Sequence, residues 1–295
     1  MTVKDKILQG RTYLGIELGS TRIKAVLIDD SFSVIASGSK QWENRFENGC
    51  WTYSLDDIHG GIQACYKDLA ENVKAQYGIY PETYGAMGIS AMMHGYMAFD
   101  KNDKLLVPFR TWRNTMTAQA AGELTKLLGF NIPQRWSIAH LYQAVLNKEA
   151  HVPYIAYINT LAGYVHKRLT DRFEVGVGEA SGIFPVEGIG YKKEYCEPTE
   201  KNLAEKGFDH KLKDILPVVR NAGEKGAVLT EEGARFLDPE GRLKAGVPVC
   251  PPEGDGQSVC RQSALKLSLL SYPLSFRFMV RAVRTPPQCS KFCFP

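Results

Sequence analysis

The chain has 295 residues, of which 44% are hydrophobic and 23% are charged, so it can bury a large core like an ordinary globular protein. It contains no apolar run of membrane-spanning length, no signal-peptide pattern and no Cys-x-x-Cys pair among its seven cysteines, so we expect a soluble cytoplasmic protein with free thiols and no membrane partner. Residues 256–295 hold six of the 36 basic residues and none of the 32 acidic ones, which leaves residues 1–255 at a net charge of −2 and argues against nucleic-acid binding by this part.

The N-terminal third predicts five short strands. Val, Ile and Leu are frequent in residues 13–18, 23–28 and 33–37, and turn residues between these segments favour an antiparallel meander. Residues 84–90 and 96–99 have the same character and are separated by AMMHG.

A long helix is predicted between the meander and these later strands. Ser54 and Asp57 have the spacing of a capping box, and apolar residues then recur at helical spacing to about Gln76. The preceding Glu47-Asn48-Gly49 is a turn signal, and the CWTYS segment that follows it is expected to be exposed.

The rest of the chain alternates helices with short strands. We expect a helix that begins after Asn159 or Thr160, loop and short strands over 176–195, helices over 116–128, 138–148 and 198–206, and a strand over 247–250. Strands that alternate with helices place the chain in the α/β class.

The segment LGIELGSTRIKAVLID, residues 14–29, is a candidate phosphate-binding element. It predicts a strand, a Gly19-Ser20-Thr21 turn and a second strand, and the amides of such a turn can bind phosphate oxygens. Glu17, beside the turn, can hold Mg²⁺ through water. The spacing is that of neither a Walker loop nor a Rossmann fingerprint, and many similar turns bind nothing.

Two further segments have side chains suited to a sugar. Met93 and His94 follow a strand, where an imidazole can bond a hydroxyl, although a buried structural histidine is the common alternative. Trp112, Arg113 and Asn114 combine an indole face with polar groups, which suits a sugar ring, but an ordinary helix N-terminus has the same composition.

Asp255 is a candidate general base. It follows a predicted strand in CPPEGDGQ and lies between two glycines, which allow a sharp turn that exposes the carboxylate. An aspartate that only stabilises a turn is the alternative.

In this order, the segments resemble the FGGY family of carbohydrate kinases, most closely its xylulokinase-like branch. LGIELGSTRIKAVLID is similar to the family's first phosphate motif, GISAMMHG to its sugar-binding Met-His segment, and TWRN to its W-x-D-x-R region. NTLAGYVHKRLT, GEASGIFPVE and AGVPVCPPEGD are similar to later motifs. The resemblance covers Tyr13 to Asp255 and implies a ribonuclease-H-like domain of the actin-like ATPase fold, with a mixed sheet and flanking helices.

The resemblance also implies the roles of individual residues. Asp255 falls on the general base, Met93, His94, Trp112, Arg113 and Asn114 on the sugar site, Glu17 on the Mg²⁺ site, and Gly19, Ser20, Thr21 and Lys24 on the ATP site. Glu17 stands where most members have Asp, and Asn114 where an acid is common, which leaves the sugar unassigned.

After Asp255 the chain no longer resembles the family. We therefore expect residues 1–255 to be the N-terminal, sugar-binding domain and 256–295 to be an unrelated basic tail, either translated out of frame and poorly folded or a true binding segment. The Pro residues of the tail argue against an amphipathic helix. The family's second, ATP-binding domain is then missing.

The expected function is ATP- and Mg²⁺-dependent phosphorylation of a sugar or polyol, a ketopentose such as xylulose, with little or no activity from this chain alone. The expected partners are the sugar and ATP, and a homodimer is left open. A non-catalytic sugar-binding or regulatory protein is the alternative. A chaperone-like or cell-shape protein of the same fold would explain the phosphate turn but not MMHG and TWRN.

Overall fold

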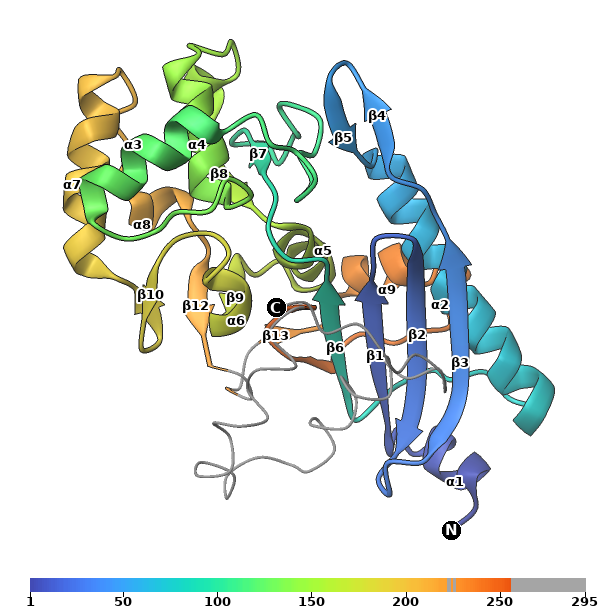
Figure 1. Ribbon diagram of the computed structural model, residues 1–295. Helices are drawn as coiled ribbons and strands as arrows, with labels where there is room; N and C mark the ends of the chain where they lie inside the picture. Colours follow the sequence, from blue (N-terminus) through green and yellow to red (C-terminus); the bar gives the residue numbers. More distant parts are fainter. Residues whose placement is uncertain (222–223, 225–226, 256–295) are drawn as a thin grey trace, which may run out of the picture.

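The computed structural model describes residues 1–221, 224 and 227–255, which form two lobes (Figure 1). One lobe contains the main β-sheet, and the other is mostly helical. The predicted tail lies outside the described residues, so its origin and the domain boundary after Asp255 stay predictions.

The first lobe is built on a mixed sheet. Among the described residues its strand order is β13-β14-β6-β1-β2-β3, and β15 also pairs with β6. β1, β2 and β3 are antiparallel, as the predicted meander requires, whereas β1, β14 and β15 all run parallel to β6, and β13 is antiparallel to β14. The bounds are β1 (Thr12–Leu18), β2 (Arg22–Asp29), β3 (Val34–Gln41), β6 (Ala86–Ala91), β13 (Ala227–Val228), β14 (Pro248–Val249) and β15 (Glu253–Gly254).

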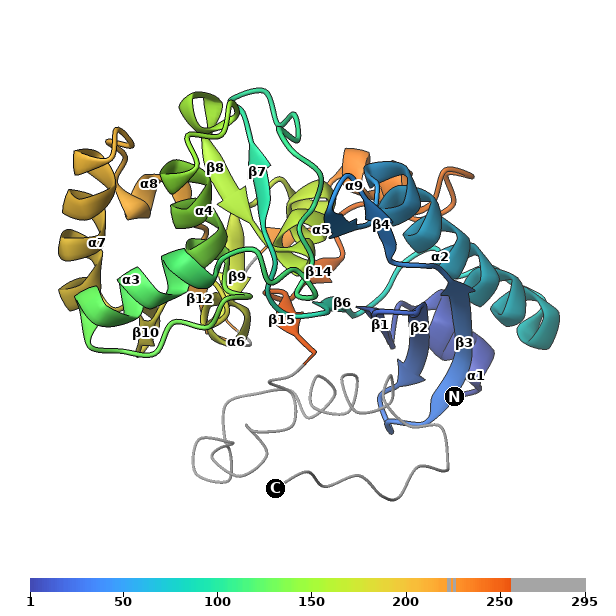
Figure 2. The ribbon, with the colours of Figure 1, turned by 45° about the horizontal axis from the view of Figure 1, so that its top comes forward.

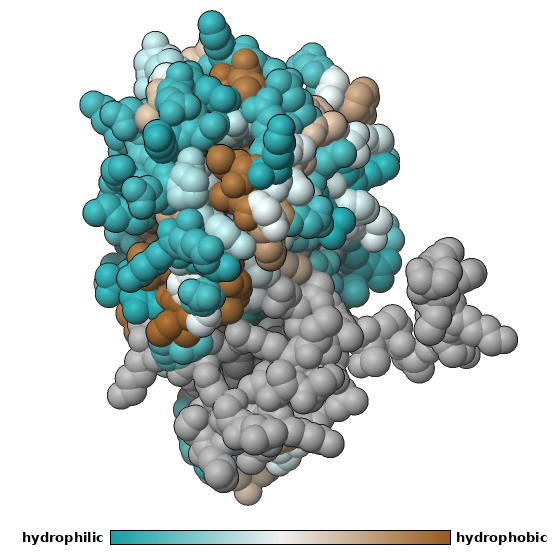
Figure 3. All heavy atoms as spheres, turned by 60° about the vertical axis from the view of Figure 1, so that its left-hand side comes forward, coloured by the Kyte–Doolittle hydropathy of each residue, from teal (hydrophilic) through white to brown (hydrophobic). Residues whose placement is uncertain are grey.

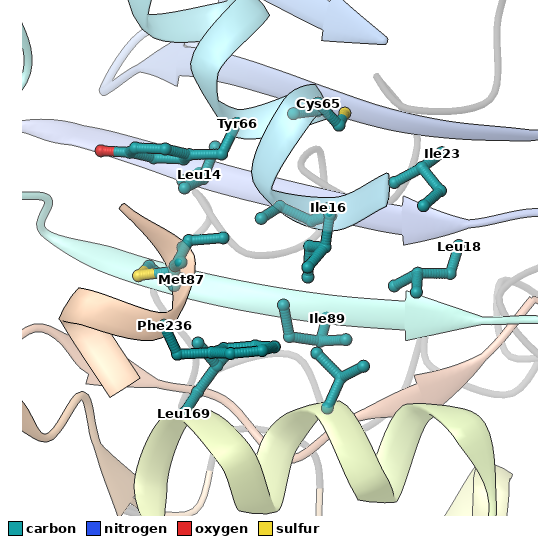
Figure 4. Close-up of a cluster of buried hydrophobic side chains, with 14 of the residues drawn as sticks. Leu14, Ile16, Leu18, Ile23, Cys65, Tyr66, Met87, Ile89, Leu169 and Phe236 are labelled. Atoms are coloured by element: carbon teal, nitrogen blue, oxygen red, sulfur yellow. The ribbon is translucent and has the colours of Figure 1, made fainter. Parts of the chain in front are cut away.

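Helices cover one face of this sheet. They are α2 (Leu55–Tyr77), α5 (Leu161–Thr170) and α9 (Glu231–Leu237). Alternate residues of β1 and β6 point into the core between sheet and helices, which also contains Tyr66 of α2 and Leu169 of α5 (Figure 4). The capping box predicted for α2 is confirmed: the Ser54 hydroxyl accepts from Asp57 N, and the Asp57 carboxylate accepts from Ser54 N.

The helical lobe has a separate hydrophobic core. Figures 1 and 2 both place it on the β6 side of the sheet, away from β3. Its elements are β7 (Met97–Phe99), α3 (Ala118–Leu128), α4 (Ser137–Leu146), η1 (Val152–Tyr154), β8 (Tyr157–Asn159), β9 (Glu174–Gly176), α6 (Val177–Ala180), β10 (Val186–Glu187), β11 (Gly190–Tyr191), α7 (Lys193–Glu205), α8 (Leu212–Ile215) and β12 (Val218–Arg220). A short α1 (Val3–Leu8) and the hairpin of β4 (Arg45–Glu47) and β5 (Cys50–Thr52) complete the described chain.

Two local predictions need correction. The loop and short strands expected over 176–195 are confirmed in part by β10 and β11. The segment also contains α6 and the first turn of α7, because Tyr195 and Cys196 pack against the second core and extend this helix upstream of Pro198. The CWTYS segment, expected to be exposed, buries the Tyr53 side chain to 1% exposure. The turn signal before it is confirmed by the β4–β5 hairpin.

The surface of the helical lobe is largely hydrophilic, with small hydrophobic patches (Figure 3). Among the described residues, none of the helices has the length and apolar character needed to cross a membrane.

Candidate functional site

Three parallel strands end level with one another at one edge of the sheet. Glu17 of β1 pairs with Ser90 of β6, and Ser90 pairs on its other side with Glu253 of β15. Since the carboxyl ends of adjacent parallel strands form the usual ligand-binding edge of an α/β sheet, the segments that follow these strands make the candidate site.

The first of these segments is the Gly19–Thr21 turn between β1 and β2. Glu17 and Lys24 lie directly opposite each other in the two strands, so their side chains leave the same face of the sheet. A Cβ atom at Gly19 would lie 3.4 Å from Glu17 Oε1, which places this carboxylate against the turn. The predicted ATP and Mg²⁺ residues therefore form one group.

Asp255 follows the shortest of the three strands. Its amide donates to Ala91 O at 2.8 Å, and its Oδ1 accepts from Met93 N at 3.0 Å. Glycine fits the residue before it, because a Cβ atom at Gly254 would lie 2.1 Å from Met93 Cγ and a side chain would have to move. The structure thus brings Asp255 and the Met93-His94 segment together across the sheet edge.

His94 occupies a strained backbone position in this segment. Its φ is +68°, in the left-handed region that non-glycine residues seldom adopt, and such residues often mark functional positions. Burial lowers the pKa of His94 to about 4, and the positive charge of Arg135 acts in the same direction. At neutral pH the imidazole is therefore uncharged and can both donate and accept a hydrogen bond.

The Trp112–Asn114 segment packs against the β4–β5 hairpin. Asn114 is buried. Its side-chain Oδ1 accepts a hydrogen bond from Trp51 N at 2.9 Å, and its Nδ2 donates one to Trp51 O at 2.8 Å. The Arg113 guanidinium stacks on the Trp51 ring at 3.6 Å, and Trp112 is 43% exposed. The polar groups of Asn114 thus hold the hairpin.

This third group is connected to the sugar segment through the backbone. Tyr96, two residues after His94, exchanges two hydrogen bonds with Arg110, two residues before Trp112. The roles of Trp112, Arg113 and Asn114 toward a sugar stay predictions.

Glu179, to which the sequence assigned no role, lies against β15, the strand that precedes Asp255. It is fully buried, its amide donates to Glu253 Oε2 at 3.3 Å, and a Cβ atom at Gly254 would lie 2.6 Å from its Oε2. Burial, with a smaller contribution from the charges of Glu253 and Asp255, raises the pKa of Glu179 to about 8 despite a lowering by the Thr160 hydroxyl. The signal that could have found it is that Glu179 is the acid of the GEASG motif.

The comparison with protein families decides the relationship. The model of the N-terminal domain of the FGGY family of carbohydrate kinases matches residues 12–260. The chain belongs to the FGGY family of carbohydrate kinases. This match confirms the family expected from the sequence. Solved structures of family members confirm the expected actin-like ATPase fold.

Individual relatives are distant. The xylulose kinase of Haemophilus influenzae is 24% identical over an alignment of 302 residues, which covers 95% of this chain and 59% of that protein. A ligand-bound xylulose kinase from Lactobacillus acidophilus has a TM-score of 0.65 at 18% identity and a gluconate kinase from the same organism 0.66 at 18%; each match covers 84% of this chain and about half of the other. This FGGY chain therefore spans roughly half the length of these kinases.

ATP and Mg²⁺ are the groups that a kinase of this family implies, and the residues present fit them. Within the described residues no group of three or more His, Cys, Asp or Glu side chains could hold a metal ion by itself. Mg²⁺ in nucleotide sites usually keeps several waters and is held by one or two carboxylates together with phosphates, and Glu17 against the turn can supply one carboxylate.

Proposed function

We propose that this chain supplies the sugar-binding half and the general base of an ATP-dependent sugar or polyol kinase. The observation that carries the proposal is the juxtaposition of Asp255 with the Met93-His94 segment at the strand edge that also holds the Gly19–Thr21 turn. A base, a neutral hydrogen-bonding group and a turn of backbone amides are the parts that phosphoryl transfer to a hydroxyl requires.

Each group has a distinct task. When bound, ATP would supply the phosphoryl group, and Mg²⁺ would offset the negative charge of the phosphates. Asp255 accepts the proton of the attacking hydroxyl. His94, uncharged at neutral pH, bonds a neighbouring hydroxyl and orients the sugar, while the turn amides and Lys24 face the phosphates.

A ketopentose such as xylulose is the proposed substrate. The Met93-His94 pair supports it, since it resembles the sugar-binding pair of the xylulokinase-like branch, and xylulose kinases are among the relatives. The fold does not choose the sugar, because the gluconate kinase is as similar in structure as the xylulose kinase.

Calorimetry of the full chain with D-xylulose, D-ribulose, glycerol and Mg·ATP tests the proposal, together with a coupled assay of ADP release. We expect a ketopentose to bind, and His94→Asn to weaken it roughly fivefold to tenfold, the value of about one hydrogen bond. Asn tolerates the left-handed backbone at this position, so the variant removes the imidazole without adding strain.

The matched control is His210→Asn, at an exposed position, which should bind as the wild type does. Absence of any sugar or polyol binding, or unchanged binding by His94→Asn, contradicts the proposal. Sugar binding without Mg·ATP binding favours a non-catalytic sugar-binding protein instead.

A further inference from the structure

The carbonyl groups of the Gly19–Thr21 turn are held by two aromatic residues. The Trp42 indole Nε1 donates to Gly19 O at 2.7 Å, and the Tyr53 hydroxyl donates to Ser20 O at 2.5 Å. The backbone amide of Trp42 donates to Thr21 O at 3.3 Å. Three successive carbonyls are thus bound by donors that lie 21 to 33 positions farther along the chain.

These two residues, named here the aromatic brace (Trp42 and Tyr53), are themselves firmly packed. Their rings stack at 4.1 Å between centroids with an interplanar angle of 24°. Tyr53 also stacks on the fully buried Phe109, whose ring edge lies against Gly95, next to His94. Because the two donor side chains are packed, each fixes the direction of the carbonyl group that it binds.

The direction of the carbonyls fixes the direction of the amides. In a planar trans peptide the C=O and the following N–H point opposite ways, so Gly19 O and Ser20 O determine where Ser20 N–H and Thr21 N–H point. Both carbonyls point to the brace, and both amides therefore point away from it. Within the described residues neither amide donates a hydrogen bond to the protein.

We propose that Trp42 and Tyr53 are positioning residues that preset the Ser20 and Thr21 amides for the phosphate oxygens of a nucleotide. This inference rests on the proposed kinase function. Oriented amides at a turn bind anions strongly only when their direction is fixed before binding, since ordering them during binding costs affinity.

The brace uses neutral donors. Burial raises the pKa of Tyr53 to about 12, so the hydroxyl keeps its proton at physiological pH, and an indole N–H does not titrate in this range. The turn is therefore held in the same way across the pH range in which a kinase works.

Two substitutions remove one donor each: Tyr53→Phe keeps the ring, and Trp42→Phe replaces the indole with a smaller aromatic ring. The matched control is Tyr84→Phe, which removes another buried hydroxyl of the same core, one that donates to Tyr66 Oη at 3.1 Å. The full chain is titrated with Mg·ATP while the ¹⁵N amide signals of Ser20 and Thr21 are followed by NMR, and D-xylulose affinity is measured by calorimetry.

We expect Mg·ATP to shift both amide signals of the wild type and each brace variant to bind Mg·ATP roughly fivefold to tenfold more weakly, with unchanged D-xylulose affinity. Tyr84→Phe lowers the melting temperature but leaves both affinities as in the wild type. A role limited to stability would give the brace variants and this control the same result.

Wild-type Mg·ATP affinity in both brace variants, or equal weakening in Tyr84→Phe, overturns the inference and leaves the proposed function standing. If Mg·ATP does not shift the turn amides of the wild type, phosphate does not lie here and the inference falls together with the ATP part of that function. Should Trp42→Phe fail to fold, Tyr53→Phe alone gives the same decision.

Discussion

The Gly19–Thr21 turn and the Asp255 segment lie at the same edge of one sheet but are held by different chemistry. The turn is bound through its carbonyls by the neutral donors of the aromatic brace. Asp255 accepts a hydrogen bond from the Met93 amide, and its charge and that of Glu253 act on the buried Glu179 carboxyl group. The turn itself is therefore held by neutral donors, whereas the Asp255 end of the site is crowded with acids.

This difference teaches where the protein should respond to pH. Peptide groups, an indole and a tyrosine with a raised pKa do not change charge between pH 5 and 8, so the turn should be indifferent to pH there. The acidic end should respond, because Glu179 binds a proton in the folded protein at a pH at which an exposed glutamate does not.

The largest expected effect is a fall in stability as pH rises. The pKa of Glu179 is raised from 4.5 to about 8, so between these values the folded state binds more protons than the unfolded state. The stabilisation is complete below pH 4.5 and is lost toward pH 8, at up to about 1.4 kcal/mol per pH unit.

Urea unfolding of Glu179→Gln between pH 5 and 8.5 measures this effect. The variant cannot ionise, so its free energy of unfolding should change less steeply with pH than that of the wild type. Glu187→Gln, at an exposed position in β10, should keep the wild-type slope. Equal slopes in all three proteins would show that Glu179 does not hold the proton.

A smaller effect is expected from Gly254→Ala, which tests the close packing of the acidic end. The added methyl group would meet Met93 Cγ at 2.1 Å and Glu179 Oε2 at 2.6 Å, so something must move. We expect a loss of about 1–3 kcal/mol in the free energy of unfolding and weaker sugar binding.

Gly122→Ala is the matched control for this substitution. It lies on an exposed part of α3 with nothing within 4 Å of the new methyl group, and should gain about 0.5–1 kcal/mol from higher helix propensity. A Gly254→Ala protein as stable as the wild type would mean that this segment has room to shift.

The smallest effect concerns the neighbourhood of the turn. Ser54→Ala removes the side-chain cap of α2 beside Tyr53 and should cost about 1 kcal/mol of stability. The hydrogen bonds of the brace do not involve Ser54, so Mg·ATP affinity should not change. A loss of that affinity would show that the turn depends on the helix as a whole and not on the brace.

The features that the sequence predicted well depend on neighbouring residues. The capping box of α2 needs only Ser54 and Asp57, the helix that follows needs a repeat of 3.6 residues, and the meander needs short apolar runs with turns between them. The family was recognisable for a related reason, because its motifs are short segments that keep their order along the chain. These signals determined the fold class and the candidates Asp255, Met93 and His94.

The tertiary structure decided how the site is held. The hydrogen bond from Met93 to Asp255 joins residues 162 positions apart, that from Glu179 to Glu253 joins residues 74 apart, and that from Tyr53 to Ser20 joins residues 33 apart. Burial and partners from distant segments determine the raised pKa of Glu179, the burial of Tyr53 and the hydrogen bonds of Asn114 to the hairpin. No local sequence pattern encodes these features. The sequence by itself named the groups that can do the chemistry, and only their packing decided which groups hold them in place.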